Sequence, residues 1–367
     1  MKSPYQSIFL AICLIIFSSC RNVTDSSAEA GPGEGCEYAR NFSLSDSSGL
    51  VRISVSESWE DGSEGEFSQR IISPERSDSL KRIVCMSTSH IAYISALGME
   101  ERIVGVSGSR YISNSKLIKR IESGLVADIG FESSLNYELL LSLRPDVVFT
   151  YGISGENNQY IEKIRQFGID VIPLGDYLEE HPLGKLEYLK LFGEILGCRE
   201  LADSLYTSAR DRYLSYREMV SETDEIPVLV NAPWKDVWYI PGEKSYMTIL
   251  AKDAGAKILG SEKNETRTKS MSIEKVYSFA SKARFWINPN SAASLEELKG
   301  MNPLFGNIDA LKKGNVYNNT RMNTPGGGSG FWEQGVVEPD IILKDLISIL
   351  HPEIFPEHTP KYYIKLK

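Results

Sequence analysis

The stretch Arg199–Glu222, RELADSLYTSARDRYLSYREMVSE, predicts one long helix around which the rest of the chain is arranged. It contains neither Pro nor Gly, and its apolar residues recur at steps of three and four, the helical period. These residues are Leu201, Leu205, Ala209, Tyr213, Tyr216 and Met219. At 1.5 Å per residue the helix would run roughly 36 Å, about the diameter of a small domain.

An α/β stretch precedes this helix from Lys81 and another follows it from Ile226, so we expect the helix to be a strut between two lobes. The alternative is a single large domain with one long surface helix.

The composition is that of an ordinary globular protein, with 42% hydrophobic and 24% charged residues. A length of 367 residues favours about two domains. The net charge of −9 argues against a nucleic-acid partner, since phosphate backbones attract basic surfaces.

The N-terminus has the features of a secretory signal peptide, which we place at residues 1–19. Lys2 precedes the apolar run Ile8–Phe17, which is too short to span a bilayer. Ser18-Ser19-Cys20 resembles the lipobox of bacterial lipoproteins, although Phe17 stands where the usual pattern has Leu. The resemblance implies that Cys20 is lipidated and that residues 20–36 form a flexible tether. The alternative is an ordinary secretory signal with an incidental cysteine.

Strand patterns occupy residues 37–80, before the first lobe. Val51, Ile53 and Val55 alternate with polar residues, and a turn at Glu60–Glu66 leads to the strand Phe67–Ile72. We expect a hairpin added to the edge of the first lobe.

Three cysteines remain after Cys20, at positions 36, 85 and 198, and no C-x-x-C motif occurs. At most one disulfide can form among them. Cys85 lies in a predicted strand, so we expect it to be buried.

The two α/β stretches have the order of parallel βαβ units. The predicted strands are Lys81–Met86, Arg102–Val106 and Arg144–Phe149 in the first half, and Ile226–Val230, Lys257–Leu259 and Lys282–Ile287 in the second. We therefore expect an N-terminal lobe at residues 81–182, a helical linker with the long helix at 183–223, and a C-terminal lobe with a tail at 224–367. A ligand cleft is expected between the lobes.

The two halves share a local pattern at an offset of 136 residues. Asn136 and Ser272 are good N-caps, and Glu138 and Glu274 fall in the first turn of the helices that follow. An acidic residue stabilises a helix N-terminus by about 0.3–1 kcal/mol, which explains either glutamate alone. Their matched positions also permit a shared role.

Ligands of parallel α/β sheets bind beyond the carboxyl ends of the strands. The loops expected there are rich in aromatic rings and cations, which suit a bulky flat ligand with negative charge. The predicted ligand contacts are Ser89, His90, Arg110, Tyr111, Tyr151, Trp234, Lys235, Trp238, Tyr239, Asn288, Arg321, Phe331 and Trp332. About half of the aromatic residues are expected to cap the core instead, and helix capping is the alternative role of His90. The run Gly326–Gly330 is interpreted as a flexible cleft loop.

Signatures of several enzyme classes are absent from the sequence, including the phosphate-binding loop, the nucleophile elbow, the H-E-x-x-H motif and the dinucleotide fingerprint. Of the four histidines, only His90 stands at a predicted strand end. We therefore expect no enzyme, no resident cofactor and no bare metal site built from several histidines.

Four segments together resemble the class III solute-binding proteins of ABC importers: RIVCMSTSHIAYISALGMEERIVGVS, NYELLLSLRPDVVF, the long helix and PGEKSYMTILAKDAGAKIL. The resemblance covers about Lys81–Leu350. It implies two Rossmann-like lobes with parallel sheets, joined by one long rigid helix, that move little on binding. It also implies that Glu138 and Glu274 dock onto arginines of the membrane permease. The implied partners are an ABC permease with its ATPase and a metal chelate, and the implied state is a lipid-anchored periplasmic monomer.

The ligand stays open between a ferric siderophore and a corrinoid. Haem ranks third, because no Tyr or His clearly stands as an axial iron ligand. Two alternatives come from other functional classes. One is an enzyme such as a chelatase on the same scaffold, and the other is an accessory lipoprotein of an outer-membrane receptor. The N-terminal hairpin and the tail after His351 depart from the common family pattern and resemble additions in Bacteroidetes relatives.

Overall fold

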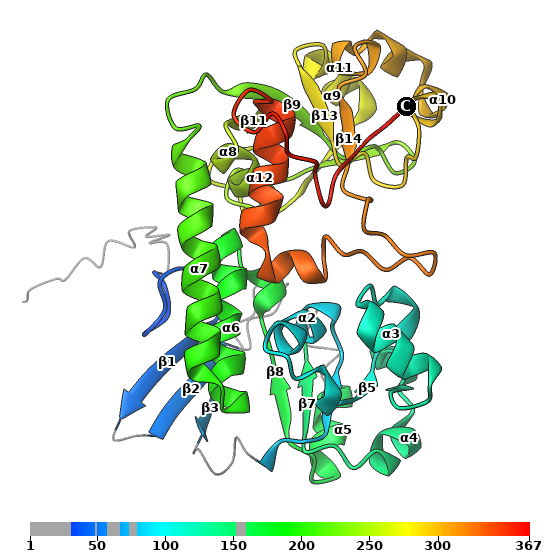
Figure 1. The fold of residues 1–367 in the computed structure, drawn as a ribbon. Coiled ribbons are helices and arrows are strands. Elements are labelled where there is room, and N and C mark those ends of the chain that lie inside the picture. Colours follow the sequence, from blue (N-terminus) through cyan, green and yellow to red (C-terminus); the bar gives the residue numbers. More distant parts are fainter. Residues whose placement is uncertain (1–30, 48–49, 57–66, 73–78, 152–158) are drawn as a thin grey trace, which may run out of the picture. The chain divides into compact units, whose positions relative to one another are not determined.

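The computed structural model describes residues 31–47, 50–56, 67–72, 79–151 and 159–367 (Figure 1). The fold reported below belongs to the unit Pro32–Lys367, from which Met1–Gly31 separates. The predicted signal peptide, Cys20 and most of the tether lie outside the described residues. Among the helices in the described part of the chain, none is both long and apolar enough to cross a membrane.

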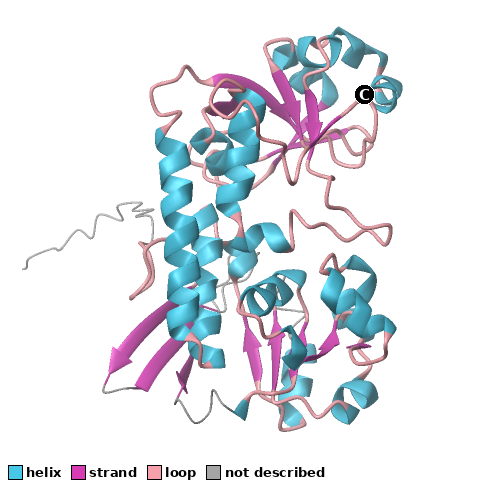
Figure 2. Cartoon of the chain, in the orientation of Figure 1, coloured by secondary structure: helices cyan, strands magenta, loops and turns pink. Residues whose placement is uncertain are grey.

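The N-terminal lobe is built on a five-stranded parallel sheet with the order β6-β5-β4-β7-β8. Its strands are β4 (Ile83–Cys85), β5 (Ile103–Val106), β6 (Ala127–Asp128), β7 (Val147–Thr150) and β8 (Val171–Pro173). Its helices are α2 (Thr88–Ala96), α3 (Ser115–Glu122), α4 (Tyr137–Ser142) and α5 (Gln159–Gln166). Four of the strands are buried along their whole length, as expected where helices cover both faces of a parallel sheet (Figure 2).

The C-terminal lobe has a second five-stranded sheet, with the order β11-β9-β13-β14-β15. β9 (Ile226–Val230), β11 (Ala256–Ile258), β13 (Phe285–Ile287) and β14 (Val316–Asn318) are parallel, which confirms the predicted pairing of α/β halves. Its helices are α8 (Tyr246–Asp253), α9 (Ile273–Ala280), α10 (Leu295–Met301), α11 (Asp309–Lys312) and α12 (Pro339–Leu350). A small antiparallel pair, β10 (Val237–Ile240) and β12 (Lys269–Ser272), stands beside this sheet as a separate ladder.

The C-terminal tail completes the second sheet. β15 (Ile364–Lys365) pairs antiparallel with β14 and so covers its edge. The buried carboxylate of Asp345 on α12 accepts hydrogen bonds from the Tyr362 amide at 2.7 Å and the Lys361 amide at 3.0 Å. His358 Nε2 lies 2.7 Å from the same carboxylate. The tail is therefore an integral part of the lobe.

Two helices form the linker between the lobes, α6 (Pro182–Leu196) and α7 (Arg199–Glu218), and they lie side by side (Figure 1). Gly197, with φ of 74°, ends α6 in the left-handed conformation that a tight reversal needs. With 20 residues, α7 is about 30 Å long.

The predicted apolar face of α7 is wrong in part. The buried residues are Ala202, Tyr206, Ala209 and Tyr213, whereas Leu201 is 45% and Met219 48% exposed. The contact with α6 determines this face, because a Cβ built on Gly193 would lie 2.4 Å from the Ala202 side chain. Close packing at this glycine turns Ala202, and not Leu201, toward α6.

The N-terminal strands β1 (Phe42–Ser47), β2 (Leu50–Ser56) and β3 (Phe67–Ile72) form an antiparallel sheet of their own. The predicted strands at Val51–Val55 and Phe67–Ile72 are confirmed, and the turn between them lies outside the described residues. The expectation that they extend the edge of the first lobe is wrong, because they share no ladder with its sheet.

Two buried carboxylates hold the segment that leads into β1. Glu187 on α6 accepts hydrogen bonds from the amides of Glu37, Tyr38 and Ala39 at 2.9–3.0 Å. Glu179 accepts from the next two amides, at positions 40 and 41, both at 2.9 Å. Burial raises the pKa of Glu179 to about 7, and these backbone hydrogen bonds oppose the shift. The N-terminal sheet is thus attached to the helical linker.

The three described cysteines, Cys36, Cys85 and Cys198, are free thiols. Cys85 is buried, as predicted, and burial raises the pKa of its thiol.

Candidate functional site

The loop after β5 presents a cation and an aromatic ring at the surface of the N-terminal lobe. Asp128 holds the start of this loop, since its carboxylate accepts from the amides of Gly108 at 3.1 Å and Ser109 at 2.7 Å. Partial burial would raise the pKa of Asp128, but these hydrogen bonds outweigh it and the pKa lies below its usual value. The exposed Arg110 guanidinium then lies 4.4 Å from the ring centre of Tyr111 and donates to its hydroxyl.

The Tyr111 ring is 37% exposed, and its centre lies 6.1 Å from that of Phe131, itself 40% exposed. The expected contacts Arg110 and Tyr111 are therefore available to a ligand. Phe131 joins them from the segment after β6, which the sequence pattern had not singled out.

The loops after β9 and β13 contain four non-glycine residues in the left-handed region. These are Asn231 (φ 61°), Lys235 (φ 57°), Asn288 (φ 53°) and Asn290 (φ 51°). Amide side chains brace them: Asn231 Nδ2 donates to the Tyr239 carbonyl at 2.7 Å, and Asn290 Nδ2 donates to that of Ala232 at 2.8 Å. Trp234, Lys235 and Tyr239 of these loops are exposed and so are accessible to a ligand.

Trp238 was predicted as a ligand contact, but it lies in the core of the C-terminal lobe with no exposed surface. Its ring centre lies 5.5 Å from those of Trp286 and Phe305. Its Nε1 donates to the Val230 carbonyl at 2.8 Å, so the polar edge of the indole is also satisfied inside the lobe.

Asn288 and Phe331 are buried as well, with 6% and 1% exposure. The Phe331 ring packs edge-on against Tyr362 and Tyr363 of the tail, which the sequence did not reveal. Both predicted contacts therefore lie in the interior of the C-terminal lobe.

His90 is fully buried, so neither of its expected roles fits. The N-cap of α2 is Ser87, whose hydroxyl accepts from the Ser89 amide at 3.4 Å, and Ser89 is itself 7% exposed. His90 Nε2 lies 3.5 Å from Asp176 Oδ1. Burial would raise the pKa of Asp176, but its interaction with His90, together with the charge of Lys185, keeps the pKa below its usual value.

Tyr151 is half-buried at the end of β7, and its ring centre lies 6.3 Å from that of Tyr177. The Tyr160 hydroxyl donates to the Tyr151 carbonyl at 2.7 Å, and burial raises the pKa of Tyr151.

The run Gly326–Gly330 was interpreted as a flexible loop, but it forms a hydrogen-bonded turn. The Thr324 amide donates to the Gly328 carbonyl at 2.9 Å, and the Gly328 amide donates to Thr324 Oγ1 at 3.0 Å. Trp332, just after this turn, is 48% exposed, and its ring centre lies 6.1 Å from that of Tyr246.

This turn meets the N-terminal lobe. A Cβ on Gly326 would lie 2.4 Å from the Arg110 carbonyl oxygen, and one on Gly328 would lie 2.6 Å from that of Tyr111. Only glycine permits such a close approach of two backbones. We call the segments Arg110–Ile112 and Thr324–Glu333 together the interlobe surface.

Three exposed cations on the strand-end loops have no carboxylate partner among the residues that the structure describes: Arg110, Lys235 and Arg321. Elsewhere, cations such as Arg212 are paired, in that case with Asp340 at 2.7 Å. Unpaired guanidinium and ammonium groups beside exposed rings suit a ligand that carries both flat apolar surface and negative charge.

The predicted docking residues are both accessible. Asn136 and Ser272 are confirmed as N-caps of α4 and α9, accepting from the Leu139 amide at 3.0 Å and the Lys275 amide at 3.3 Å. Glu138 and Glu274 stand exposed in the first turns of these two helices.

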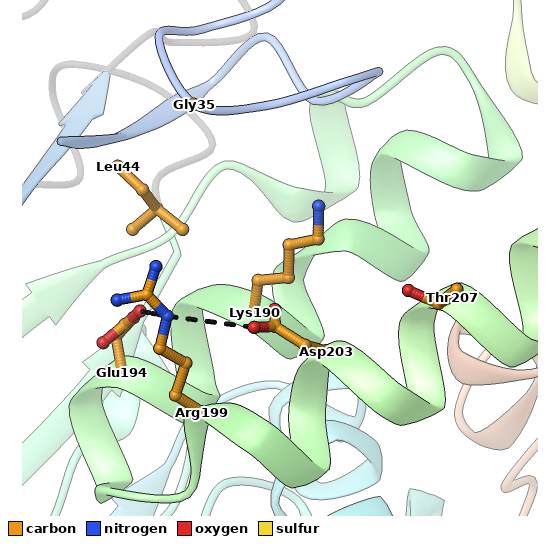
Figure 3. Close-up of a pocket in the computed structure, with 7 residues that line it drawn as sticks. All are labelled: Gly35, Leu44, Lys190, Glu194, Arg199, Asp203 and Thr207. Atoms are coloured by element: carbon orange, nitrogen blue, oxygen red, sulfur yellow. Dashed lines mark ion pairs between the residues drawn. The ribbon is translucent and has the colours of Figure 1, made fainter. Parts of the chain in front are cut away.

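A cavity of about 450 Å³ lies away from these loops, between the N-terminal segment and the helices α6 and α7 (Figure 3). Its charged lining is largely self-paired: Arg199 Nε lies 3.0 Å from Glu194 and 3.8 Å from Asp203. Lys190 lies 3.0 Å from Glu187. This cavity is a weaker candidate than the loops, because its cations already have anionic partners.

The family described as periplasmic binding protein matches residues 83–320. An uncharacterized lipoprotein of Methanocaldococcus jannaschii is 26% identical over 300 residues, which cover 78% of this chain and 69% of that protein.

Two solved structures show the same fold at low sequence identity. A periplasmic haem-binding protein from Pseudomonas aeruginosa has a TM-score of 0.55 at 19% identity, covering 76% of this chain and 94% of that one. The periplasmic vitamin B12 binding protein of Vibrio cholerae has a TM-score of 0.53 at 13% identity, covering 76% and 98%.

Proposed function

Because the chain belongs to the periplasmic binding protein family, we propose that it captures a metal chelate and delivers it to an ABC importer. The observation that carries the proposal is a set of three exposed cations, Arg110, Lys235 and Arg321, with no carboxylate partner among the described residues. Two of them lie beside exposed rings, Arg110 at 4.4 Å from the ring centre of Tyr111 and Lys235 at 5.3 Å from that of Trp234. Rings supply apolar contact area, and the cations neutralise anionic groups on the ligand. The protein works as a monomer with a permease and its ATPase, and it holds no resident cofactor.

A ferric, anionic chelate fits these loops better than a corrinoid, which offers less negative charge to three cations. Ferric siderophores are therefore the first candidate. Haem is the second, favoured by the exposed Tyr111 whose hydroxyl accepts a hydrogen bond from Arg110. Tyrosine is a known haem-iron ligand, and a guanidinium beside it would balance the charge of a bound phenolate. This pair supplies the axial candidate that the sequence had not identified.

Titration of the purified protein with three probes tests the proposal: ferric enterobactin, which is an anionic tricatecholate, haemin and cyanocobalamin. We expect saturable quenching of tryptophan fluorescence by at least one ferric probe, since Trp234 and Trp332 are half exposed on the loops. Native mass spectrometry of protein isolated from its own cells would identify the natural chelate. Absence of binding for all three probes, together with no metal-bearing species in the mass spectrum, would refute the proposal. A chelatase would instead release a probe with altered metal content.

The lipid anchor at Cys20 gains support from the lipoprotein relative. We expect Cys20→Ser to move the protein from the membrane fraction to the soluble fraction without changing its melting temperature. Retention of the variant in membranes would indicate a different anchor.

Glu138 and Glu274 are proposed to dock onto permease arginines, one from each lobe. Both are exposed and lie outside the strand-end loops, so replacing them with alanine should leave ligand affinity intact. Loss of a charge pair at an interface costs about 2–5 kcal/mol when the pair is buried, and mainly slows association when it lies at the rim. We expect uptake through the reconstituted importer to fall in each variant and most in the double variant.

Glu296→Ala is the matched control for this experiment. Glu296 also lies in the first turn of a C-terminal-lobe helix, α10, with its side chain 81% exposed, but it has no counterpart in the other half. Normal uptake by the double variant would show that the repeated glutamates are only helix-stabilising residues.

A further inference from the structure

Glu333 is a buried carboxylate that crosses from one lobe to the other. It belongs to the C-terminal lobe, between β14 and α12, and is 2% exposed. Its two oxygens accept hydrogen bonds from the backbone amides of Ser113 at 2.6 Å and Asn114 at 2.8 Å. Both amides belong to the N-terminal lobe.

These amides stand at the beginning of α3, where Asn114 is the N-cap. The Asn114 side chain accepts from the Leu117 amide at 3.0 Å, so the helix has its own cap in addition to Glu333. A negative charge at this position also meets the positive end of the helix dipole. The carboxylate of one lobe is thus bound by charge-assisted hydrogen bonds to the helix start of the other.

The backbone on each side of this contact is fixed locally. The Glu333 amide donates to the Ser329 carbonyl at 2.9 Å, and the Gly330 amide donates to the Met322 carbonyl at 3.2 Å. On the other side, Asn114 Nδ2 donates to Ser95 Oγ at 3.1 Å. The contact therefore joins two braced segments.

The glycine turn makes a second contact beside the first. Gly326 and Gly328 approach the carbonyls of Arg110 and Tyr111 so closely that a Cβ would clash with them. Arg110 and Tyr111 stand two to four residues before the amides that Glu333 binds, and Trp332 directly precedes Glu333. The exposed side chains of the interlobe surface are therefore positioned by the contact.

We propose that Glu333 is a positioning residue of the ligand site, which locks the two lobes together at the interlobe surface. The role rests on the proposed function, because the site that it positions is the chelate site. The helices α6 and α7 connect the lobes at one place. Glu333, together with the short helix η7 (Gln334–Val337) that follows it and packs against α2, connects them at a second. Two separate connections fix the spacing between Arg110 and Trp332 before the ligand arrives, which lowers the ordering cost of binding.

The test combines a measurement without ligand and one with ligand. Hydrogen exchange reports on the amides of Ser113 and Asn114, and pulsed electron paramagnetic resonance reports on the distance between the lobes. The exposed Lys119 and Lys312, one in each lobe, are changed to cysteine and spin-labelled. The native cysteines are changed to serine so that only these two positions carry a label. In Glu333→Gln and Glu333→Ala we expect the two amides to exchange about tenfold to hundredfold faster, the factor for losing a hydrogen bond to a charged group. We also expect a broader distance distribution.

The ligand arm uses whichever of haemin or ferric enterobactin binds the native protein. We expect that probe to dissociate about tenfold faster from both variants, since the loops no longer hold their spacing. Gly328→Ala disturbs the same interface without removing a charge. It should also broaden the distribution of distances between the lobes. Asn136→Ala is the matched control: it removes a helix cap in the N-terminal lobe but should leave the exchange at Ser113 and Asn114, and the dissociation rate, unchanged.

The outcomes separate the two proposals. Unchanged exchange and distances in Glu333→Ala would overturn the interlobe role, whatever the probes do. Altered exchange with native dissociation would reduce Glu333 to a helix cap and overturn its positioning role. Failure of the native protein to bind any probe would refute the proposed function, while the exchange and distance data still decide whether the lobes are locked.

Discussion

Replacing Trp238 with alanine is expected to lower the free energy of unfolding by about 3–5 kcal/mol, the usual range for losing a fully buried aromatic side chain. The ring has no exposed surface and packs against Trp286 and Phe305, so its removal leaves a cavity in the C-terminal lobe. The Val230 carbonyl also loses its hydrogen bond from Nε1. Urea unfolding followed by circular dichroism measures the loss.

Trp234→Ala provides a control of the same residue type from the same stretch of sequence. Trp234 is 51% exposed, so its replacement should leave the unfolding free energy nearly unchanged and weaken ligand binding instead. Equal stability of the two variants would contradict the buried position of Trp238.

The double variant Arg110→Ala/Trp332→Ala is expected to show the largest loss of ligand affinity. Each side chain stands exposed on one of the two segments that meet at the interlobe surface. Truncating a good aromatic or arginine anchor costs roughly 1–3 kcal/mol, and the two act on different parts of the ligand. We therefore expect the Kd for the bound ferric probe to rise by about a hundredfold or more. Fluorescence titration, or absorbance for haemin, gives the value.

The control is a matched double variant, Arg82→Ala/Phe167→Ala. It removes one arginine and one aromatic ring from the side of the N-terminal sheet where the strands begin, opposite the strand-end loops. Arg82 directly precedes β4, and Phe167 follows α5 before β8. Both side chains are exposed, so stability should change little in either double variant. A similar loss of affinity in both would show that the probe binds through non-specific surface contacts.

Local sequence patterns determined the elements of this fold. β9 begins at Ile226 and ends at Val230, as the apolar run predicts, and Asn136 and Ser272 cap their helices through side-chain oxygens. Such features depend on residues within one or two turns of each other, so a single stretch of sequence contains the information. The pairing of α/β halves follows in the same way, because strand–helix–strand units leave few topologies open.

The buried face of a helix or strand was harder to predict from the sequence than the element itself. In β10, Trp238 and Ile240 are buried while Tyr239 between them is exposed, as a strand with one face on the core requires. The sequence pattern places Trp238 and Tyr239 in a loop, and a loop carries no expectation that buried and exposed side chains alternate. The apolar face of α7 was displaced for a related reason: the partner helix α6, with its small residue Gly193, selects the face that packs.

Only the tertiary structure decided how the site is assembled. Glu333 meets Ser113 and Asn114 across about 220 positions of the chain, and the tail residues Tyr362 and Tyr363 support Phe331 from the far end of the sequence. The sequence by itself determined which loops carry cations and rings, because residues at strand ends can be read from local periodicity. It did not determine which of these side chains reach the surface. Exposure depends on contacts between segments far apart in the chain, and the local spacing of residues carries no information about the energies of those contacts.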